Sequence, residues 1–97
     1  MKLRFTPIAV TEIAAIADYL LVRNPMAAER VCAAIYDSLT NLLLFPLAGR
    51  RQKTDAVRKI VTSRDRYIIY YTFDESAEEI VVLNVKHPAR ERDHEDA

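Results

Sequence analysis

Two proline pairs mark the starts of two helices in the first half of the chain. In Thr6-Pro7 and Asn24-Pro25, a residue that can cap a helix precedes a proline, which suits the first helical position because its missing N–H has no partner there. Apolar residues follow each pair at three- and four-residue spacing. The predicted buried residues are Val10, Ile13, Ala14, Ala17, Leu20 and Leu21 in the first helix and Ala28, Val31, Cys32, Ile35, Leu39, Leu42 and Leu43 in the second. Pro46 ends the second helix, and the short link between the two predicts an antiparallel helical hairpin.

The rest of the chain has the pattern of β-strands. Residues 2–6 alternate apolar and polar side chains, and residues 57–62, 67–73 and 80–85 are rich in β-branched or aromatic residues. Residues 47–56 contain the one glycine and several polar residues, which predicts a loop. The last three strands are joined by connections of hairpin length, so they should be antiparallel neighbours. We therefore predict an α+β fold of order β-α-α-β-β-β, with the helical hairpin packed on one face of an antiparallel sheet.

Length and composition narrow the class of protein further. The 97 residues suffice for one domain, which we place at residues 1–92, followed by a charged tail at residues 93–97. The single cysteine cannot form an internal disulfide, and the single glycine cannot build a phosphate-binding loop. No run of about 20 apolar residues is present, so we expect a cytoplasmic protein that does not enter a membrane. We expect no metal ion and no other cofactor.

The charge of the chain is neutral in total but unevenly distributed. Fourteen Lys and Arg balance fourteen Asp and Glu. Between Arg50 and Arg66, however, seven basic residues stand against two acidic ones, whereas from Tyr67 onward three basic residues stand against eight acidic ones. The basic stretch is either a contact surface for phosphates or an acidic protein, or a solvated loop and strand face.

The order of the elements and the residues at their corners resemble the ParE branch of the RelE/ParE superfamily of type II toxin–antitoxin toxins, over about residues 2–92. The residues that carry the resemblance are Thr6-Pro7, Ala9, Tyr19, Pro46-Leu47-Ala48-Gly49-Arg50, Val57-Arg58-Lys59-Ile60-Val61, Tyr67-Ile68-Ile69-Tyr70-Tyr71, Ile80-Val81-Val82-Leu83-Asn84-Val85 and His87-Pro88-Ala89-Arg90. The order and spacing of these short segments are specific together, although no single one is.

The resemblance implies a small toxin that a cognate antitoxin neutralises. The ParE branch is associated with poisoning of DNA gyrase, and the RelE branch with ribosome-dependent cleavage of mRNA. The antitoxin would be ParD-like and DNA-binding, with a disordered C-terminal segment that wraps the toxin. The toxin alone would not bind specific DNA sequences.

Cleavage of RNA would need positioned acid, base and cationic groups. In this chain Ile68 stands where RelE-like nucleases carry an Arg just after the first Tyr of that strand, and the tail after Arg90 contains no Tyr. Arg58, Lys59 and Arg90 would remain as cations, with His87 or His94 as acid or base. We therefore predict a non-enzymatic inhibitor of gyrase, with a RelE-like mRNA endoribonuclease as the alternative and an inactive binding module as a third possibility.

Such an inhibitor needs a contact surface instead of a catalytic site. The candidates for target binding are Arg50, Arg51, Arg58, Lys59, His87 and Arg90. Arg58 could instead cap a turn or pair within the sheet, for example with Glu79, and His87 could simply be a hydrogen-bonded residue at a strand end. Two helices can cover only one face of the sheet, so a Tyr-rich surface on the other would suit an antitoxin segment. The candidates for antitoxin binding are Tyr67, Tyr70 and Tyr71.

Overall fold

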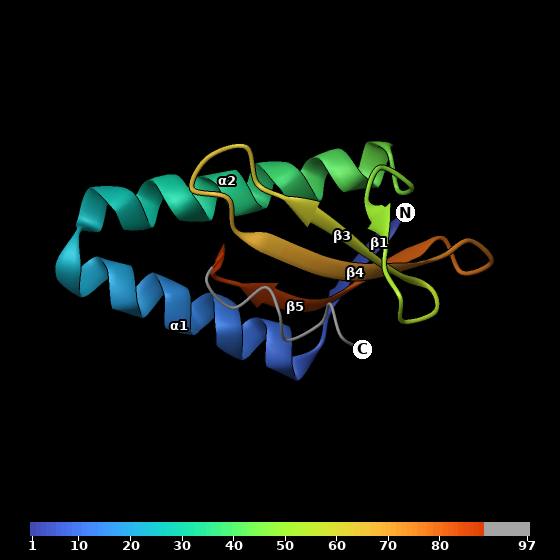
Figure 1. Cartoon of the computed structure of the whole chain (residues 1–97), viewed down its shortest axis with the longest axis horizontal. Helices are drawn as coiled ribbons and strands as arrows, with labels where there is room; N and C mark the ends of the chain where they lie inside the picture. Colours follow the sequence, from blue (N-terminus) through green and yellow to red (C-terminus); the bar gives the residue numbers. More distant parts are fainter. Residues whose placement is uncertain (89–97) are drawn as a thin grey trace.

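The computed structural model describes residues 1–88, in which two helices pack against a five-stranded sheet (Figure 1). The elements are β1 (Lys2–Phe5), α1 (Pro7–Arg23), α2 (Pro25–Leu44), β2 (Arg50–Arg51), β3 (Val57–Val61), β4 (Ile68–Asp74) and β5 (Glu79–Lys86). The α+β class, the helical hairpin and the four predicted strands are confirmed. The predicted tail at residues 93–97 lies outside the described residues, as do Arg90 and His94.

The sheet differs from the prediction in two details. Its strand order is β1-β5-β4-β3-β2, and β1 runs parallel to β5 while the other pairs are antiparallel. The sheet is therefore mixed. β1 and β5 can be parallel because all the other elements of the chain lie between them, whereas a tight turn would make them antiparallel. The second difference is β2, a two-residue strand inside the predicted loop. A hydrogen bond from the Gln52 N–H to the Val57 carbonyl at 2.9 Å closes the connection between β2 and β3.

Both predicted helix caps are present. The Thr6 hydroxyl accepts a hydrogen bond from the Ala9 N–H at 3.0 Å, and the Asn24 side chain accepts one from the Ala27 N–H at 3.1 Å. The Thr6 hydroxyl also donates to the Leu83 carbonyl at 2.8 Å, so the cap ties the start of α1 to β5. Each cap satisfies a backbone donor that the first turn of a helix would otherwise leave without a partner.

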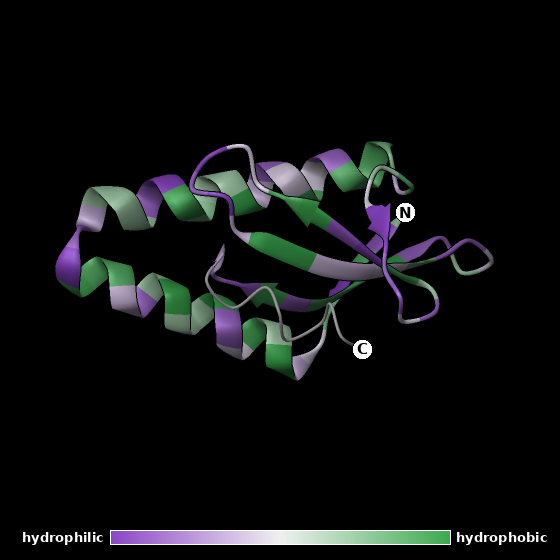
Figure 2. Cartoon of the chain, in the orientation of Figure 1, coloured by the Kyte–Doolittle hydropathy of each residue, from purple (hydrophilic) through white to green (hydrophobic). Residues whose placement is uncertain are grey.

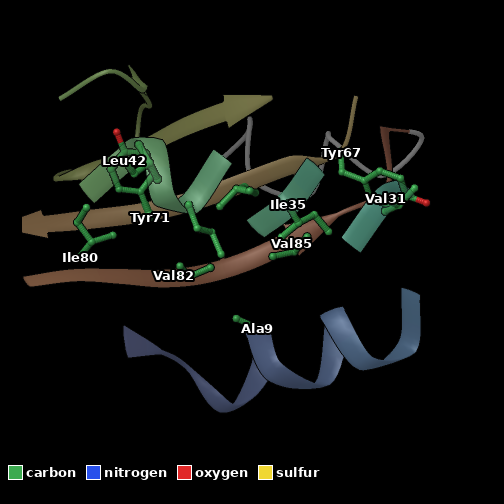
Figure 3. Close-up of a cluster of buried hydrophobic side chains, with 11 residues drawn as sticks. Ala9, Val31, Ile35, Leu42, Tyr67, Tyr71, Ile80, Val82 and Val85 are labelled. Atoms are coloured by element: carbon green, nitrogen blue, oxygen red, sulfur yellow. The ribbon is translucent and has the colours of Figure 1, made fainter. Parts of the chain in front are cut away.

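The main core lies between the helical hairpin and one face of the sheet (Figure 3). It contains Ala9, Val31, Ile35, Leu39 and Leu42 from the helices and Tyr67, Ile69, Tyr71, Ile80, Val82 and Val85 from β4, β5 and the residue before β4. The stripe predicted for α2 is confirmed for five residues, which are buried: Ala28, Val31, Ile35, Leu39 and Leu42. Cys32, which we predict to be a buried hydrophobe, is instead a half-buried free thiol.

The stripe predicted for α1 is partly wrong. The residues of α1 that pack on the core are Ala9, Ile13, Ile16 and Leu20. Val10, Ala14 and Leu21 belong to the predicted stripe but are exposed, Val10 to 55% and Leu21 to 54%. The prediction failed because α1 carries apolar residues on all sides, so that spacing alone does not select the buried side.

The sheet face away from the helices has an apolar cluster of its own. Val57, Ile68 and Tyr70 are buried there, and Leu83 packs against them. A register shift of the β4–β5 pair lies between Tyr70 and Tyr71, where Leu83 of β5 has no directly opposed residue on β4. Figure 2 shows the hydrophobic start of β4 and, in contrast, the strongly hydrophilic β2.

Candidate functional site

The turn after α2 is held by side chains from two strands. The Tyr71 hydroxyl donates a hydrogen bond to the Pro46 carbonyl and accepts one from the Gly49 N–H, both at 2.8 Å. The Arg58 guanidinium donates to the Gly49 carbonyl at 2.8 Å and to the Leu47 carbonyl at 3.3 Å. Burial raises the pKa of Tyr71, and this effect outweighs the Gly49 hydrogen bond and the nearby Arg58 charge. The phenol therefore stays protonated and able to donate at neutral pH.

Gly49 is required by this arrangement. A Cβ atom at residue 49 would lie 2.5 Å from the Tyr71 hydroxyl oxygen and 2.6 Å from its Cε1, closer than van der Waals contact allows. The close approach lets the aromatic ring reach both backbone groups of the turn. The turn thereby fixes where β2, and with it Arg50, begins.

The strand register sorts the predicted basic residues onto different faces of the sheet. Directly paired residues of neighbouring strands point to the same face. Arg50 pairs with Lys59, Lys59 with Tyr70, and Tyr70 with Asn84. Arg50, Lys59 and Tyr70 form a line across the face away from the helices, which we call the polar row. The Asn84 side chain instead reaches α1, where its amide donates a hydrogen bond to the Glu12 carboxylate at 3.3 Å. Arg51 and Arg58 pair with each other, and Arg58 pairs with Tyr71, so both arginines belong to the helix-covered face.

The prediction of one basic surface is therefore wrong in part. The structure brings Arg50 and Lys59 together, while the guanidinium of Arg58 is occupied by the turn. The alternative for Arg58, a cap within the fold, matches its observed partners, although its expected partner Glu79 instead pairs with Arg4 at 3.3 Å.

His87 lies apart from the polar row, at the end of β5. Its ring packs edge-on against Tyr67 with the ring centroids 5.4 Å apart. Both residues line a pocket of about 460 Å³ between α1 and the end of β5, together with Tyr19, Glu12 and Lys86. The Glu12 carboxylate pairs with Lys86 at 2.6 Å and accepts a hydrogen bond from the Val85 N–H at 3.0 Å. Glu12 therefore joins α1 to β5 under this pocket.

The three tyrosines predicted for antitoxin binding are all buried. Tyr67 and Tyr71 belong to the core under the helices, and Tyr70 to the cluster on the opposite face. Burial also raises the pKa of Tyr67. The expectation that these rings form an exposed surface is thus wrong, because they fill the two apolar clusters of the sheet. Their role in antitoxin binding itself stays a prediction.

Sequence reasoning missed a groove along the outer side of α2. The groove has a volume of about 1060 Å³ and extends from Met26 to Leu44, with Val61 and Arg64 on its other wall. Arg30 donates two hydrogen bonds to Asp65, at 2.9 and 3.1 Å, and so links α2 to the β3–β4 turn beside the groove. The hydrogen bond from Arg30 lowers the pKa of Asp65. Met26 and Leu44 could have signalled the groove, because both lie outside the apolar stripe predicted for α2.

Residues 1–88 contain neither a candidate metal site nor a helix that could span a membrane. No group of three His, Cys, Asp or Glu side chains in that part of the chain could hold a metal ion. Neither α1 nor α2 combines the length and the apolarity that a bilayer-spanning helix needs.

The helical hairpin on a mixed sheet, with a polar row on the opposite face, defines a small α+β protein of the RelE/ParE type. A model of the "ParE toxin of type II toxin-antitoxin system, parDE" matches residues 3–92. The chain therefore belongs to the ParE toxin family. It is also similar in fold to the solved structure "Chromosomal ParDE TA system from P. aeruginosa", with a TM-score of 0.75 and 23% identity over 90% of this chain and 95% of that one. A search of curated proteins found no match.

Proposed function

We propose that this chain is a toxin that arrests growth by binding DNA gyrase, without catalysing a reaction, and that a cognate ParD-like antitoxin holds it inactive in the cytoplasm. Membership of the ParE toxin family supports the type II toxin. The choice of a protein-binding mechanism depends on the side chains of the sheet.

The buried position of Ile68 carries this choice. At that position RelE-like nucleases are expected to have an Arg, which would stabilise the extra negative charge of the transition state. Here the side chain is aliphatic, 2% exposed, and packed with Val57 and Tyr70. An aliphatic side chain cannot stabilise a phosphorane. Arg58 is another candidate cation, but its guanidinium donates hydrogen bonds to the carbonyls of Leu47 and Gly49.

The polar row supplies a surface of the kind that an inhibitor needs. Arg50 is exposed at the edge of the sheet and lies directly across from Lys59. Two neighbouring cations on one face favour an acidic partner surface by steering its approach and fixing its orientation. We therefore assign target binding to the face that carries Arg50 and Lys59.

The same row favours a RelE-like mRNA endoribonuclease as the second candidate. Lys59 lies directly across from Tyr70, so a cation and a phenol share this face. A substrate phosphate could be bound by Arg50 and Lys59, although a nuclease would also need an acid and a base within reach of the 2′-hydroxyl and the leaving oxygen.

One pair of assays separates the two candidates. The purified toxin should inhibit supercoiling by DNA gyrase or trap cleaved DNA on the enzyme, and it should leave mRNA on translating ribosomes intact. Cleavage of that mRNA, with unaffected supercoiling, would overturn the proposed mechanism. Expression without an antitoxin should arrest growth, and coexpression of the protein encoded by the adjacent reading frame should restore it. Normal growth in the absence of an antitoxin would contradict the toxin function itself.

A further inference from the structure

The sheet face away from the helices is more deeply buried than its place in the fold explains. Tyr70 and Ile68 belong to this face and are 0% and 2% exposed. The helices pack on the other face, and the neighbours of the two side chains here are Val57 and Leu83. A sheet face that no helix covers is commonly in contact with water. The burial of Tyr70 therefore indicates that a further segment lies over the middle of this face.

The same part of the face carries positive charge. Arg50 and Lys59 are directly paired neighbours in the polar row. The carboxylates of β4 and β5, those of Asp74 and Glu79, lie opposite each other at the far end of the two strands. There Arg4 binds Glu79 at 3.3 Å. A segment that covers the polar row would therefore need to be acidic.

The chain itself supplies an acidic segment. The tail at residues 93–97 contains three carboxylates, from Asp93, Glu95 and Asp96, and no Lys or Arg. It lies outside residues 1–88, so its charge is taken from the sequence. Its charge is opposite to that of the polar row, and it follows β5, the strand next to β4.

The chain is also long enough for the tail to reach the polar row. Lys86 ends β5 two residues after Asn84, which pairs with Tyr70. Two residues along the strand and two strand spacings across the sheet place Lys59 about 12 Å from Lys86. A third strand spacing places Arg50 about 16 Å away. Asp93 follows Lys86 by seven residues, which span up to about 24 Å when extended.

Two other cations lie close to the end of β5. The turn between β3 and β4 carries Arg64 and Arg66, and it is adjacent to this end because Ile68 pairs with Lys86. Arg64, however, lines the groove along α2. A contact of the tail with either arginine would leave the burial of Tyr70 unexplained.

We propose that the acidic tail binds the polar row of its own chain, with its carboxylates against Arg50 and Lys59, and that it competes with the target for this surface. Attachment to the same chain gives the tail a high effective concentration, on the order of millimolar for a short flexible linker. Ion pairs at a protein surface are individually weak, so a partner that binds more tightly displaces the tail. The inference rests on the proposed function only where it concerns the target.

Acetylation of lysines, followed by mass spectrometry, tests the contact without any target. The tail variant removes the three negative charges by Asp93→Asn, Glu95→Gln and Asp96→Asn. The matched control makes the same change of net charge at exposed positions of the helices, by Asp18→Asn, Glu29→Gln and Asp37→Asn. The internal reference is Lys53, an exposed lysine between β2 and β3.

Lys59 should be acetylated about threefold faster, relative to Lys53, in the tail variant than in the wild type, which corresponds to the loss of a surface ion pair. The control should leave this ratio unchanged, and about 1 M salt should remove the difference between wild type and tail variant. An unchanged ratio in the tail variant, or an equal rise in the control, would overturn the inference. Protection of Lys59 that increases with protein concentration would assign the contact to the tail of another copy and overturn it as well.

Inhibition of DNA gyrase tests the competition. The tail variant should half-inhibit the enzyme at a several-fold lower concentration than the wild type, whereas the control should not. Faster acetylation of Lys59 with unchanged inhibition would overturn the competition between tail and target. If the wild-type chain does not inhibit gyrase at all, the proposed function fails, and the acetylation of Lys59 still decides whether the tail binds the polar row.

Discussion

The hydroxyl of Tyr71 offers the sharpest test of how this fold is held together. Tyr71 is fully buried, and its hydroxyl makes two hydrogen bonds of 2.8 Å, to the Pro46 carbonyl and from the Gly49 N–H. Tyr71→Phe removes only the oxygen atom and keeps the ring in the core. Any loss of stability therefore reports on these two hydrogen bonds.

The expected loss follows from the groups left behind. A net contribution of about 1 kcal/mol per hydrogen bond gives about 2 kcal/mol for the pair. Gly49 is buried, so its N–H would be left without this partner, and a buried unsatisfied group of this kind costs about 1–3 kcal/mol. We expect Tyr71→Phe to lower the free energy of unfolding by about 2–3 kcal/mol, which in a domain of this size corresponds to a fall in melting temperature of about 10–20 °C.

Urea titration followed by circular dichroism measures this loss directly. The midpoint should fall while the slope of the free energy against urea stays unchanged, because the substitution leaves the surface exposed on unfolding almost the same. Tyr36→Phe is the matched control, since the Tyr36 side chain is 70% exposed and should lose less than about 0.5 kcal/mol. A loss of similar size in both variants, or none in Tyr71→Phe, would refute the view that the Tyr71 hydroxyl holds the turn.

Three further predictions concern charged residues. Arg58→Ala should lower the free energy of unfolding by about 1–2 kcal/mol in a urea titration, because it removes two charge-assisted hydrogen bonds at a partly exposed site, and an unchanged midpoint would contradict that role. Arg50→Ala should raise the toxin concentration that half-inhibits gyrase several-fold, whereas Arg51→Ala, on the other face of the sheet, should not, so equal effects would argue against the polar row as the target surface. The lowered pKa of Asp65 means that its ion pair stabilises the fold fully above the pKa of an unfolded aspartate, about 3.9, and loses this effect as the pH falls through the folded-state pKa. Acid unfolding of Asp65→Asn should therefore lack that component, and identical acid transitions in variant and wild type would refute it.

Most of the fold could be predicted because local signals agree with the final structure. The caps at Thr6 and Asn24 and the stops near Pro46 need only neighbouring residues, and the apolar runs of β4 and β5 need only burial. The two-residue β2 was missed because its pairing depends on the Gln52–Val57 hydrogen bond and not on a β-type sequence of its own. The parallel pairing of β1 was missed because strand direction across a crossover depends on the path of the whole chain.

The candidate surface was less predictable, since it depends on the pairing register. Sequence alone groups Arg50, Arg51, Arg58 and Lys59 as one basic stretch. The register then separates Arg50 and Lys59 from Arg51 and Arg58, because neighbouring residues of a strand point to opposite faces. A shift of the β2–β3 pair by one residue would exchange the two sets, so identifying the polar row required knowing the pairing.

The error in α1 shows what fixes the rotation of a helix that is apolar on all sides. Spacing allowed a buried line through Val10 and Leu21 as well as the observed one through Ile13 and Leu20. The polar contacts of two residues decide between them. The Thr6 hydroxyl donates to the Leu83 carbonyl, and the Glu12 carboxylate accepts from the Val85 N–H and pairs with Lys86. If α1 rotated to bury Val10, Glu12 would turn away from β5 and lose these partners. Polar contacts that join Thr6 and α1 to β5 therefore select the buried side of α1, because the hydrophobic periodicity of this helix is ambiguous.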